Sequence, residues 1–556
     1  MLDVLIRNAT VVDGSGRPSF RADLAVKDGI ITGVGDLSWA SAAKTIDASD
    51  LIAAPGFIDS HAHSDFAVMH NPPCESHVCQ GVTTEISCNC GKSPFPVLPN
   101  PLPLKNIADT VWTTPKDFWH SQQEYFEIFE RQGCGINLMP LVGHNNIRCS
   151  VIGMENRPCT PDELEQMKAL LRESFELGIP GFSTGLTYTP GQGAEPEEII
   201  ELAKVVAEYG GMYTTHMSNY SGVGLESAMD FAAETAWKSG MRLEFSHIAP
   251  HSEDLYGKGQ WMCDLLEKYQ KMGVDACADV PSYPTIGVWH GPRAIFPRWL
   301  YNWKTPWPEQ AQKIKDAILD PGKNSELRAY IEKLRTMEHV SFLGQFFGFH
   351  DWDHIFVKTV RKGSENEKYI DWSIAQIAKD KGVADPTDVY FDLCVTECED
   401  FCSVNILEHD EDRRILFNSP YTFFGSDVYA ISPDDPYSCF SRFQLHPRWF
   451  GHAVYVIETI YKKNHWLTLE GAIHKMTGGP ARHFNLHDRG LLRSGYKADI
   501  VLFNLENMHE TATYFSPVSL PTGVEHVFVN GVEEFAHGRF TGNLGGVALL
   551  RGKGVR

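Results

Sequence analysis

The stretch "APGFIDSHAHSD" (residues 54–65) decides the fold, because it joins a short apolar run to two histidines spaced two apart. The letters "FID" are typical of a buried β-strand, and alternate residues on a strand point to the same face. His61 and His63 can therefore reach one point in space at the C-terminal end of this strand. A metal ion is the obvious candidate for that point, although two histidines alone do not establish a metal site.

Seven further apolar runs follow this one, and most of them precede a helical pattern such as "TPDELEQMKALLRESFELG". Near-continuous apolar strands that alternate with helices indicate a parallel sheet, and eight such units predict a closed (β/α)₈ barrel in an α/β protein. The eight runs are residues 56–63, 83–90, 136–144, 181–186, 212–218, 242–248, 273–280 and 421–427.

The two ends of the chain consist of short alternating runs broken by turn residues, which is a β-hairpin composition. We expect residues 1–55 and 486–556 to form one small β-sandwich domain, with "NG" at 530–531 as a tight turn. The barrel then occupies residues 56–485. An insertion at about 285–420 is rich in Trp, Phe, Pro and His, and we expect it to be a lid over the barrel mouth. The alternative is a peripheral insertion with its own core.

Composition and charge narrow the class of protein. The chain has 556 residues, 43% of them apolar, and a formal net charge of −22. This charge argues against nucleic-acid partners and against an anionic membrane surface. The first residues lack the pattern of a signal peptide, and we find no apolar run long enough to span a bilayer. Thirteen cysteines without framework spacing indicate reduced thiols. We therefore expect a cytoplasmic, soluble protein. The composition does not identify a substrate, and the small-molecule substrate that we expect follows from the site residues below.

Candidate metal ligands stand at or near the ends of the predicted strands, and strand ends converge on one face of such a barrel. Imidazole, thiolate and carboxylate together suit Zn²⁺ best among the common metals. The chemistry indicated is attack of an activated water on a carbonyl group, with Asp427 as a ligand, as the general base, or as both in succession. The candidate residues are His61, His63, Cys90, His144, His216, His247 and Asp427.

The order of motifs along the chain resembles the amidohydrolase superfamily, and within it the N-acyl-D-amino-acid deacylases (D-aminoacylases). The match covers nearly the whole chain except residues 286–415. The motifs are "HAH" (61–63), "GVTTEISCNCG" (81–91), "LVGHNNIR" (141–148), "GFSTGLTYTPG" (181–191), "HMSNYS" (216–221), "SHI" (246–248), "GSD" (425–427), "HPRWFG" (446–451), "MTGGPARHFNLHDRGLLRSGYKADIVLFN" (476–504) and "VFVNG" (527–531).

The resemblance implies a barrel with a β-sandwich made from both termini. It also implies two metal positions that share Cys90 as a bridging ligand, occupied by one or two zinc ions. One implied metal position has the ligands His61, His63, Cys90 and Asp427, and the other has Cys90, His216 and His247. His144 is expected to bond a metal ligand or the substrate, with plain structural bonding as the alternative. Tyr188 is expected to contact the substrate. Cys88 stands where the family usually has Gly, and it either supports Cys90 or simply packs.

The chain departs from the family where the substrate carboxylate is held. The family's sixth-strand His is followed by Leu-Lys, whereas here His247 is followed by Ile248 and Ala249. His251 could replace that lysine only if its pKa were raised. Tyr283 in "DVPSYPT" keeps one family tyrosine, which is expected to steady an oxyanion together with zinc. Arg448 survives and can make a bidentate contact with a carboxylate.

Three functional hypotheses follow. The first is a zinc-dependent amidohydrolase that cleaves the C–N amide bond of an N-acyl-D-amino acid or a related N-acyl compound. The second is the same site acting on a carboxylate-free or bulky aromatic amide, a cyclic amide, a carbamate or a lactone, with Ala249 as its support. The third is a non-catalytic relative, which the complete ligand set disfavours. A homo-oligomer is compatible with each of them.

Overall fold

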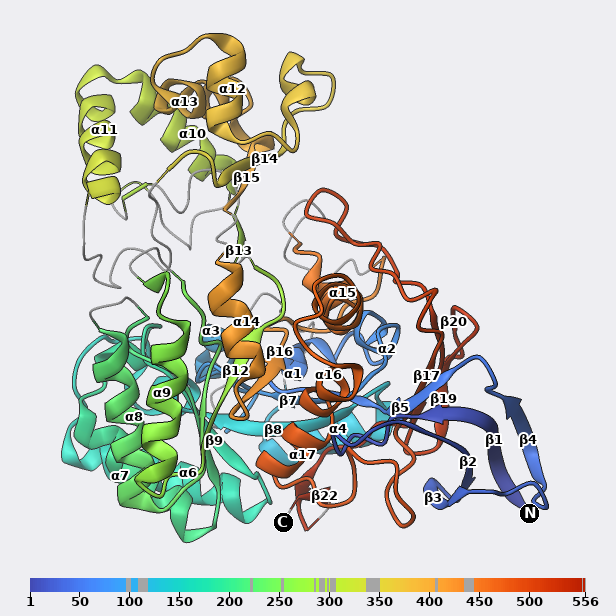
Figure 1. Cartoon of the computed structure of the whole chain (residues 1–556). Helices are drawn as coiled ribbons and strands as arrows, with labels where there is room; N and C mark the ends of the chain where they lie inside the picture. Colours follow the sequence, from blue (N-terminus) through green and yellow to red (C-terminus); the bar gives the residue numbers. More distant parts are fainter. Residues whose placement is uncertain are drawn as a thin grey trace.

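The computed structural model shows three parts: a barrel, a sheet made from both ends of the chain, and an α-rich unit standing above them (Figure 1). In the part of the chain that it describes, no helix combines the length and the apolar character needed to cross a bilayer. The described residues are 1–96, 102–108, 119–220, 224–251, 255–284, 287–289, 296–297, 300, 307–336, 351–405, 409–434, 445–552 and 554–555.

The barrel consists of eight parallel strands, in the spatial order β6, β7, β8, β9, β10, β11, β12 and β16. Backbone hydrogen bonds bring the two ends of this order together, because the amide of His63 donates to the carbonyl of Val428 at 2.8 Å and that of Ser60 donates to the carbonyl of Phe424 at 3.2 Å. The predicted barrel is confirmed. Its strands are β6 (Phe57–Asp59), β7 (Val82–Ser87), β8 (Asn137–Gly143), β9 (Gly181–Gly185), β10 (Met212–His216), β11 (Leu243–Phe245), β12 (Ala276–Pro281) and β16 (Thr422–Gly425).

Helices cover the outside of the barrel, and α6 to α9 lie side by side there (Figure 1). Helix α6 begins where the sequence signals it: Thr160 and Glu163 form a capping box and Pro161 occupies the first turn. The helices of this part are α1 (Ser64–Ala67), α2 (Glu75–Val78), α3 (Leu102–Ala108), α4 (Gln122–Gln132), α5 (His144–Ile152), α6 (Pro161–Glu176), α7 (Pro196–Glu208), α8 (Leu225–Ser239), α9 (Gly259–Lys271), α14 (Asp410–Asn418), α15 (Arg448–Tyr455), a π-helix (Val456–Lys463), α16 (Leu469–Lys475) and α17 (Gly478–His483).

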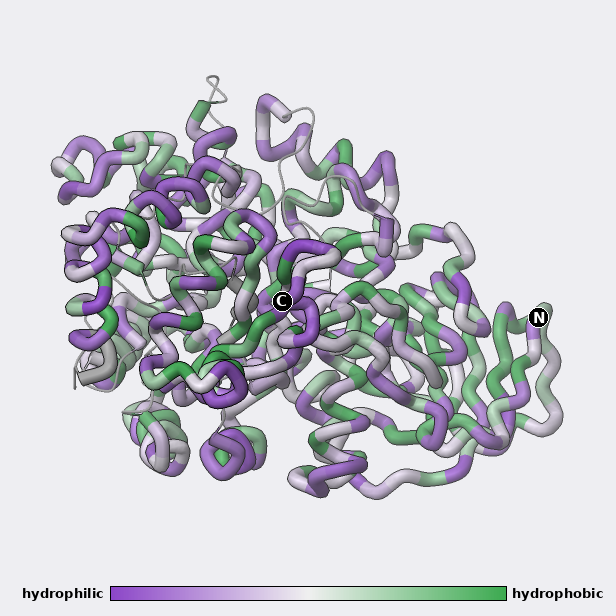
Figure 2. The backbone as a smooth tube through the Cα atoms, turned by 90° about the horizontal axis from the view of Figure 1, so that it is seen from above, coloured by the Kyte–Doolittle hydropathy of each residue, from purple (hydrophilic) through white to green (hydrophobic). Residues whose placement is uncertain are grey.

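Both ends of the chain build one nine-stranded sheet, in which β5 pairs antiparallel with β17 through Ala54 and Val501. Asn530 and Gly531 form the tight turn between β18 and β19, both with positive φ, at 49° and 81°. The strands near the N-terminus carry green apolar stretches interrupted by purple polar residues (Figure 2). The strands are β1 (Leu2–Val11), β2 (Phe20–Lys27), β3 (Ile30–Gly35), β4 (Ala42–Asp47), β5 (Ile52–Pro55), β17 (Ile500–Phe503), β18 (Val524–Val529), β19 (Val532–Ala536) and β20 (Arg539–Phe540), and two short strands follow, β21 (Leu550–Arg551) and β22 (Gly554–Val555).

The insertion has a hydrophobic core of its own, to which Leu327, Val357 and Phe401 belong. It leaves the barrel at the carboxyl end of β12 and returns through α14, so it stands on the side of the barrel where the strands end. A separate core is what we expect if the insertion is peripheral. That the insertion forms a lid over the barrel mouth stays a prediction. The elements are β13 (Gly287–Trp289), α10 (Trp307–Leu319), α11 (Pro321–Thr336), β14 (Ile355–Thr359), α12 (Ile374–Lys381), α13 (Pro386–Thr396) and β15 (Cys402–Asn405).

Candidate metal centre

Six of the predicted ligands meet at the carboxyl ends of the barrel strands, in two groups that share one thiol. Within each group the ligand atoms lie within 4.8 Å of one another. The first group is His61, His63, Cys90 and Asp427, and the second is Cys90, His216 and His247.

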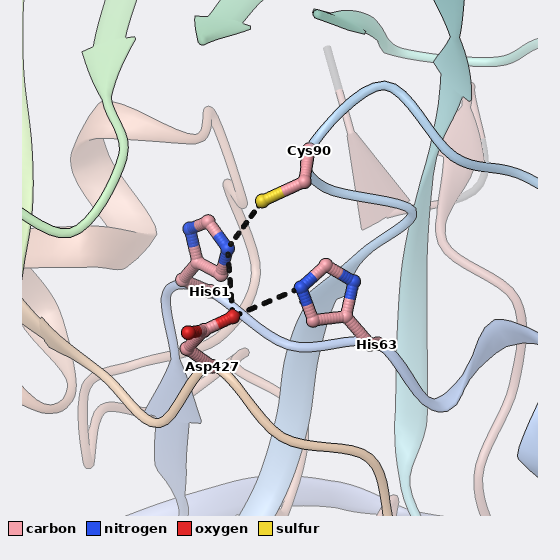
Figure 3. Close-up of side chains that lie close together, drawn as sticks. All are labelled: His61, His63, Cys90 and Asp427. Atoms are coloured by element: carbon pink, nitrogen blue, oxygen red, sulfur yellow. Dashed lines mark hydrogen bonds and ion pairs between the residues drawn. The ribbon is translucent and has the colours of Figure 1, made fainter. Parts of the chain in front are cut away.

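The first group joins residues from three strand ends (Figure 3). The Nε2 atom of His61 lies 3.5 Å from the Sγ atom of Cys90 and 3.6 Å from Oδ1 of Asp427. The Nε2 atom of His63 lies 3.1 Å from the same Asp427 oxygen. Asp427 is the partly exposed member of this group, while the other three are buried. Its carboxylate is therefore the one that faces the mouth.

The second group is more compact. The Sγ atom of Cys90 lies 3.5 Å from Nδ1 of His216 and 3.7 Å from Nε2 of His247, and these two ring nitrogens are 3.0 Å apart. Three soft or borderline donors that face one another in a buried space are the donor set that zinc prefers. Thr187 bonds the other ring nitrogen of His216 at 2.7 Å and fixes its orientation.

Three of the six candidate ligands have a backbone conformation that is rare outside glycine. The φ angles of Cys90, His247 and Asp427 are 54°, 38° and 53°. Such residues persist where the surrounding structure holds them, and they cluster at functional sites. Here the amide of Asp427 donates to the carbonyl of His61 at 2.8 Å, which ties the end of β16 to the end of β6.

Asp279 holds two of the candidate ligands, and the sequence interpretation missed it. Its Oδ2 atom lies 2.9 Å from Nδ1 of His61, and its Oδ1 atom accepts the backbone N–H of His247 at 2.8 Å. A carboxylate behind a ligating imidazole fixes the tautomer and the ring orientation. Gly425 makes room for this contact, because a Cβ there would lie 2.6 Å from Cβ of His61 and 2.8 Å from Oδ1 of Asp279. Alternation along β12 places Asp279 inside the barrel, and this pattern could have identified Asp279 from the sequence.

The electrostatics of the site favour the ionised forms of both acidic donors. Burial opposes ionisation of the Cys90 thiol, yet the charges and hydrogen bonds of His61 and His247 bring its pKa below the ordinary value. Burial likewise opposes ionisation of Asp427, but the hydrogen bond from His63 and the charge of Arg448 hold its pKa well below its usual range. A thiolate and a carboxylate are the forms that coordinate a metal.

Two predicted substrate contacts lie beside the cluster. One guanidinium nitrogen of Arg448, at the start of α15, is 3.5 Å from Oδ2 of Asp427. The ring centroid of Tyr188 is 4.5 Å from that of His216. Lys92, which the sequence interpretation did not single out, places its ammonium 4.4 Å from the centre of the Tyr188 ring. Burial lowers the pKa of Lys92, and the charges of Cys90 and Asp427 act against this.

Tyr283 follows the carboxyl end of β12, and its hydroxyl donates to the carboxylate of Glu510. Burial raises the pKa of Glu510 to about 7, and the hydrogen bond from Tyr283 opposes that rise. Glu510 lies between β17 and β18, so this segment contacts the residues that follow β12. The oxyanion role expected for Tyr283 requires this hydrogen bond to open.

Three other residues of interest do not join the cluster. His144 is fully buried and its Nε2 bonds Glu198 at 2.7 Å, in a network that includes Arg148. This contact is the one that the structural alternative requires, and a bond from His144 to a metal ligand or to the substrate stays a prediction. The Cys88 thiol packs in the core, because its left-handed backbone (φ 64°) breaks the alternation that would aim it like Cys90. His251 is bonded to the carbonyl of His247 at 2.7 Å, and burial and the His247 charge lower its pKa to about 3. It stays neutral and does not replace the absent lysine.

Comparison with known proteins agrees with this geometry. A family model described as "Amidohydrolase family" matches residues 416–533. The chain is 31% identical to an N-acyl-D-glutamate deacylase and 30% identical to an N-acyl-D-aspartate deacylase, both from Alcaligenes xylosoxydans xylosoxydans. These matches cover 96% and 95% of this chain, and 94% and 91% of the relatives.

A solved structure is similar over its whole length. It is the N-acyl-D-glutamate deacylase of Bordetella bronchiseptica in complex with zinc and a phosphonate inhibitor that mimics the tetrahedral intermediate. The TM-score is 0.73 at 27% identity, over 99% of each chain. The barrel and its ligand cluster are those of a metal-dependent amidohydrolase. Within that class, the chain belongs to the N-acyl-D-amino-acid deacylase family.

Proposed function

We propose that this chain is a zinc-dependent hydrolase that cleaves the amide bond of N-acyl-D-amino acids. The observation that carries the proposal is the convergence of the two ligand groups on the shared Cys90 thiol. The relatives' activities and the zinc found in one solved relative support it.

The donors fit one or two zinc ions. Cys90, His216 and His247 offer one sulfur and two nitrogens within 4.8 Å of one another, and these three donors would hold a zinc ion in the way that three protein ligands do in catalytic zinc sites. The first group offers a second position that shares Cys90. When bound, zinc supplies a Lewis acid for the scissile carbonyl and for the attacking water.

Asp427 moves the proton in this mechanism. It is the cluster residue with solvent access, and its low pKa keeps it ionised. Its oxygens could then accept a proton from a water whose acidity a bound zinc ion would raise. Once protonated, the same carboxyl group donates that proton to the nitrogen of the leaving amine, so that water has been added across the C–N bond. Arg448 and His63 hold the carboxylate in place from two sides.

Arg448 also supplies a contact for the substrate's α-carboxylate. It is buried, and its Nε atom has no acceptor among the residues that the structure describes. A carboxylate that binds the edge of this guanidinium satisfies that donor and stands beside the reacting centre. The resemblance to the family motif "HPRWFG" supports the same role.

A second candidate function keeps the zinc site but changes the substrate to a carboxylate-free or bulky aromatic amide, a cyclic amide, a carbamate or a lactone. The observation that favours it is Ala249, which lines a small cavity next to Tyr283 where the family has a lysine. His251 does not take the place of that lysine, because its pKa is lowered to about 3. Arg413 also lines this cavity, but its guanidinium donates to the carbonyl of Ser282 at 2.7 Å and pairs with Asp410 at 2.9 Å.

A hydrolysis assay on zinc-loaded enzyme separates the two. The panel contains N-acetyl-D-amino acids, their L-enantiomers, and carboxylate-free amides and esters with bulky aromatic groups. We expect turnover of the D-series and not of the L-series. Turnover of the carboxylate-free compounds alone would reject the proposed substrate while leaving the hydrolase intact.

We also propose a cytoplasmic location and a homo-oligomeric state. All twelve cysteines in the described residues are free thiols, which supports a reducing compartment. Size-exclusion chromatography with light scattering measures the oligomeric state directly.

A further inference from the structure

A third group of possible metal donors lies at the amino end of the barrel. One carboxylate oxygen of Asp275, the Sγ atom of Cys277 and one ring nitrogen of His483 lie within 4.8 Å of one another. Asp275 immediately precedes β12, Cys277 is the second residue of β12, and His483 is the last residue of α17. Helix α17 lies on the side of the barrel away from the insertion (Figure 1). None of the hydrolytic steps above uses this group.

The third group and the Cys90 cluster lie toward opposite ends of the same strand. Asp279 holds His61 near the carboxyl end of β12, and Cys277 comes two residues earlier, so both side chains point into the barrel. Glu244 on β11 is the partner of Cys277 in the parallel ladder and faces the same way. The interior of the barrel therefore carries metal-binding types of side chain at both ends.

Glu244 stands behind His483 as Asp279 stands behind His61. The Oε2 atom of Glu244 lies 2.9 Å from Nε2 of His483. The other ring nitrogen, Nδ1, lies 3.7 Å from Oδ1 of Asp275, which is too long for a hydrogen bond. A carboxylate behind one ring nitrogen orients the imidazole and leaves the other nitrogen for a metal.

The nitrogen that is left over is buried. Only 3% of the His483 surface is exposed, and its Nδ1 atom has no hydrogen-bond partner in the part of the chain that the structure describes. Oε1 of Glu244 is also buried without such a partner there, and Glu244 is 1% exposed. Buried polar atoms without partners cost free energy, which a bound cation beside them would offset.

We propose that Asp275, Cys277 and His483 bind a zinc ion at a site separate from the hydrolytic one. A thiolate, an imidazole and a carboxylate are a donor set that zinc prefers. Cys277 coordinates as the thiolate, and its proton leaves to solvent when the ion binds. This site shares no ligand with the Cys90 cluster, and its role is to fasten the end of α17 to the start of β12.

The ion at the amino end is held less tightly than an ion at Cys90. The Asp275 side chain is 56% exposed, and its Oδ2 atom pairs with Nε of Arg242 at 3.3 Å. This guanidinium repels a dication and competes for the carboxylate, whereas all three donors of the second ligand group are buried. Dialysis therefore empties the amino-end site, and the zinc that a dialysed enzyme retains reports on the Cys90 cluster alone.

Cobalt(II) is the probe for the test, because a thiolate bound to it gives a charge-transfer band in the near ultraviolet. Metal-free Cys90→Ala, which lacks the shared thiol of the hydrolytic site, is titrated with cobalt(II). We expect a saturable thiolate band that comes from Cys277. The double variant Cys90→Ala/Cys277→Ser should lose the band. Cys90→Ala/Cys263→Ser is the matched control and should keep it, since the Cys263 thiol on α9 contacts the carbonyl of Ile415 at 3.9 Å.

Glu244→Gln tests the positioning of His483. The three ligands remain, so the band should appear in the Cys90→Ala background, but we expect the cobalt affinity to fall by about 10- to 100-fold. An unchanged affinity would contradict the part assigned to Glu244.

The dialysed wild type with its tightly held zinc gives a readout that does not depend on Cys90→Ala. Further zinc should raise its melting temperature, and this rise should be smaller in Cys277→Ser, because a bound ion stabilises only the folded chain. Cys277→Ser should keep wild-type kcat/KM, since Cys277 belongs to neither ligand group of the hydrolytic site.

Two results overturn the inference. If Cys90→Ala has the circular dichroism of the wild type but shows no thiolate band, or if the Cys277→Ser double variant shows the same band, the third group is only an ion-paired network between α17 and the barrel. If further zinc stabilises the wild type and Cys277→Ser to the same extent, no metal fastens α17 to β12.

Discussion

At the scale of single residues, the site depends on one thiol and on the groups that aim its neighbours. Cys90 is common to both ligand groups, and its left-handed backbone directs the Sγ atom to the point where they meet. Asp279 lies behind two histidines and holds both of them. Substitution of each of these residues should change a different measurable property, so their roles can be tested separately.

Cys90→Ala should remove the metal. Both ligand groups lose the atom that they share, so we expect the zinc content measured by plasma mass spectrometry to fall to nearly zero after dialysis. Cys88→Ala is the matched control, because this buried thiol is two residues away and packs in the core. Retention of zinc by Cys90→Ala would contradict the shared-ligand assignment.

Asp427→Asn should keep zinc and lose turnover. The second ligand group does not contain Asp427, so it still holds an ion. An amide cannot take the proton from water, and we expect kcat to fall by about 100-fold or more. Zinc content and steady-state kinetics on the same preparation decide the matter, and full activity of the variant would rule out the proton-transfer role.

Asp279→Asn should weaken zinc binding although Asp279 is not itself a candidate ligand. An asparagine cannot accept hydrogen bonds from His61 and from the His247 amide through two carboxylate oxygens, so the imidazole of His61 loses its orientation. We expect zinc affinity, measured by competition with a chelator, to fall by about 10- to 100-fold. Asp275→Asn, whose side chain is 56% exposed on the same segment, should leave it unchanged. Equal affinities for the two variants would argue against the orienting role.

At the scale of elements, the loops at the carboxyl ends of the strands are locked to one another by close backbone contacts. Gly91, in the loop after β7, is the clearest case. A Cβ at this position would lie 2.5 Å from both Oδ1 of Asn145 on α5 and the amide nitrogen of Gly185 on β9. This packing fixes Cys90 and Lys92 on either side of it. The precision of the site therefore comes from the fit of neighbouring loops to one another.

Gly91→Ala tests this fit. The variant adds a left-handed alanine, which costs about 1–2 kcal/mol, and a Cβ that meets two backbone or side-chain atoms at 2.5 Å. We expect a lower melting temperature and weaker zinc binding. Gly210→Ala shares a positive φ of 65° but has nothing within 4 Å of its Cβ, so it should lower the melting temperature slightly and keep the zinc affinity. If the two variants behave alike, the close contact at Gly91 is unimportant.

At the scale of the whole molecule, buried carboxyl groups inside the barrel make stability depend on pH. Burial raises the pKa of Glu85 on β7 to about 8, while hydrogen bonds from Ser64 oppose this. In the unfolded chain a glutamate titrates near 4.3. Between these two values the folded protein binds a proton that the unfolded chain does not, so the free energy of unfolding falls as pH rises.

Glu85→Gln should remove this dependence. The wild type loses up to about 1.4 kcal/mol of stability per pH unit from this group between roughly pH 4.3 and pH 8. We expect the melting temperature of the variant, relative to wild type, to rise steadily from pH 5 to pH 8 at saturating zinc. Glu208→Gln on the exposed end of α7 should show no such trend. A constant difference between Glu85→Gln and wild type would place the Glu85 pKa near its ordinary value.

The strands were predictable from the sequence because each is a short apolar run in a chain of helical patterns, and all eight are found where expected. The clustering of the candidate ligands was predictable because strand ends converge in a barrel, and their binding of metal stays a prediction. Contacts between distant segments could not be derived in this way: His144 bonds Glu198 on α7, and the Lys92 ammonium lies over the ring of Tyr188 in the loop after β9. Alternation also failed at Cys88, where the strand has ended and φ is positive. The chemistry of the site was thus easier to predict than the residues that surround it.

The sheet made from both ends of the chain has a consequence for synthesis on the ribosome. The ribosome makes strand β5 about 450 residues before β17, the strand with which β5 pairs antiparallel. At 5–20 residues per second this delay is roughly 20–90 s, during which the apolar edge of β5 has no partner from the C-terminal strands. Ile52, Ala53 and Ala54 are buried in the finished protein and are exposed to other nascent chains until then. A chain that stops before β17 keeps that open edge, and so becomes a client for chaperones or a seed for aggregation.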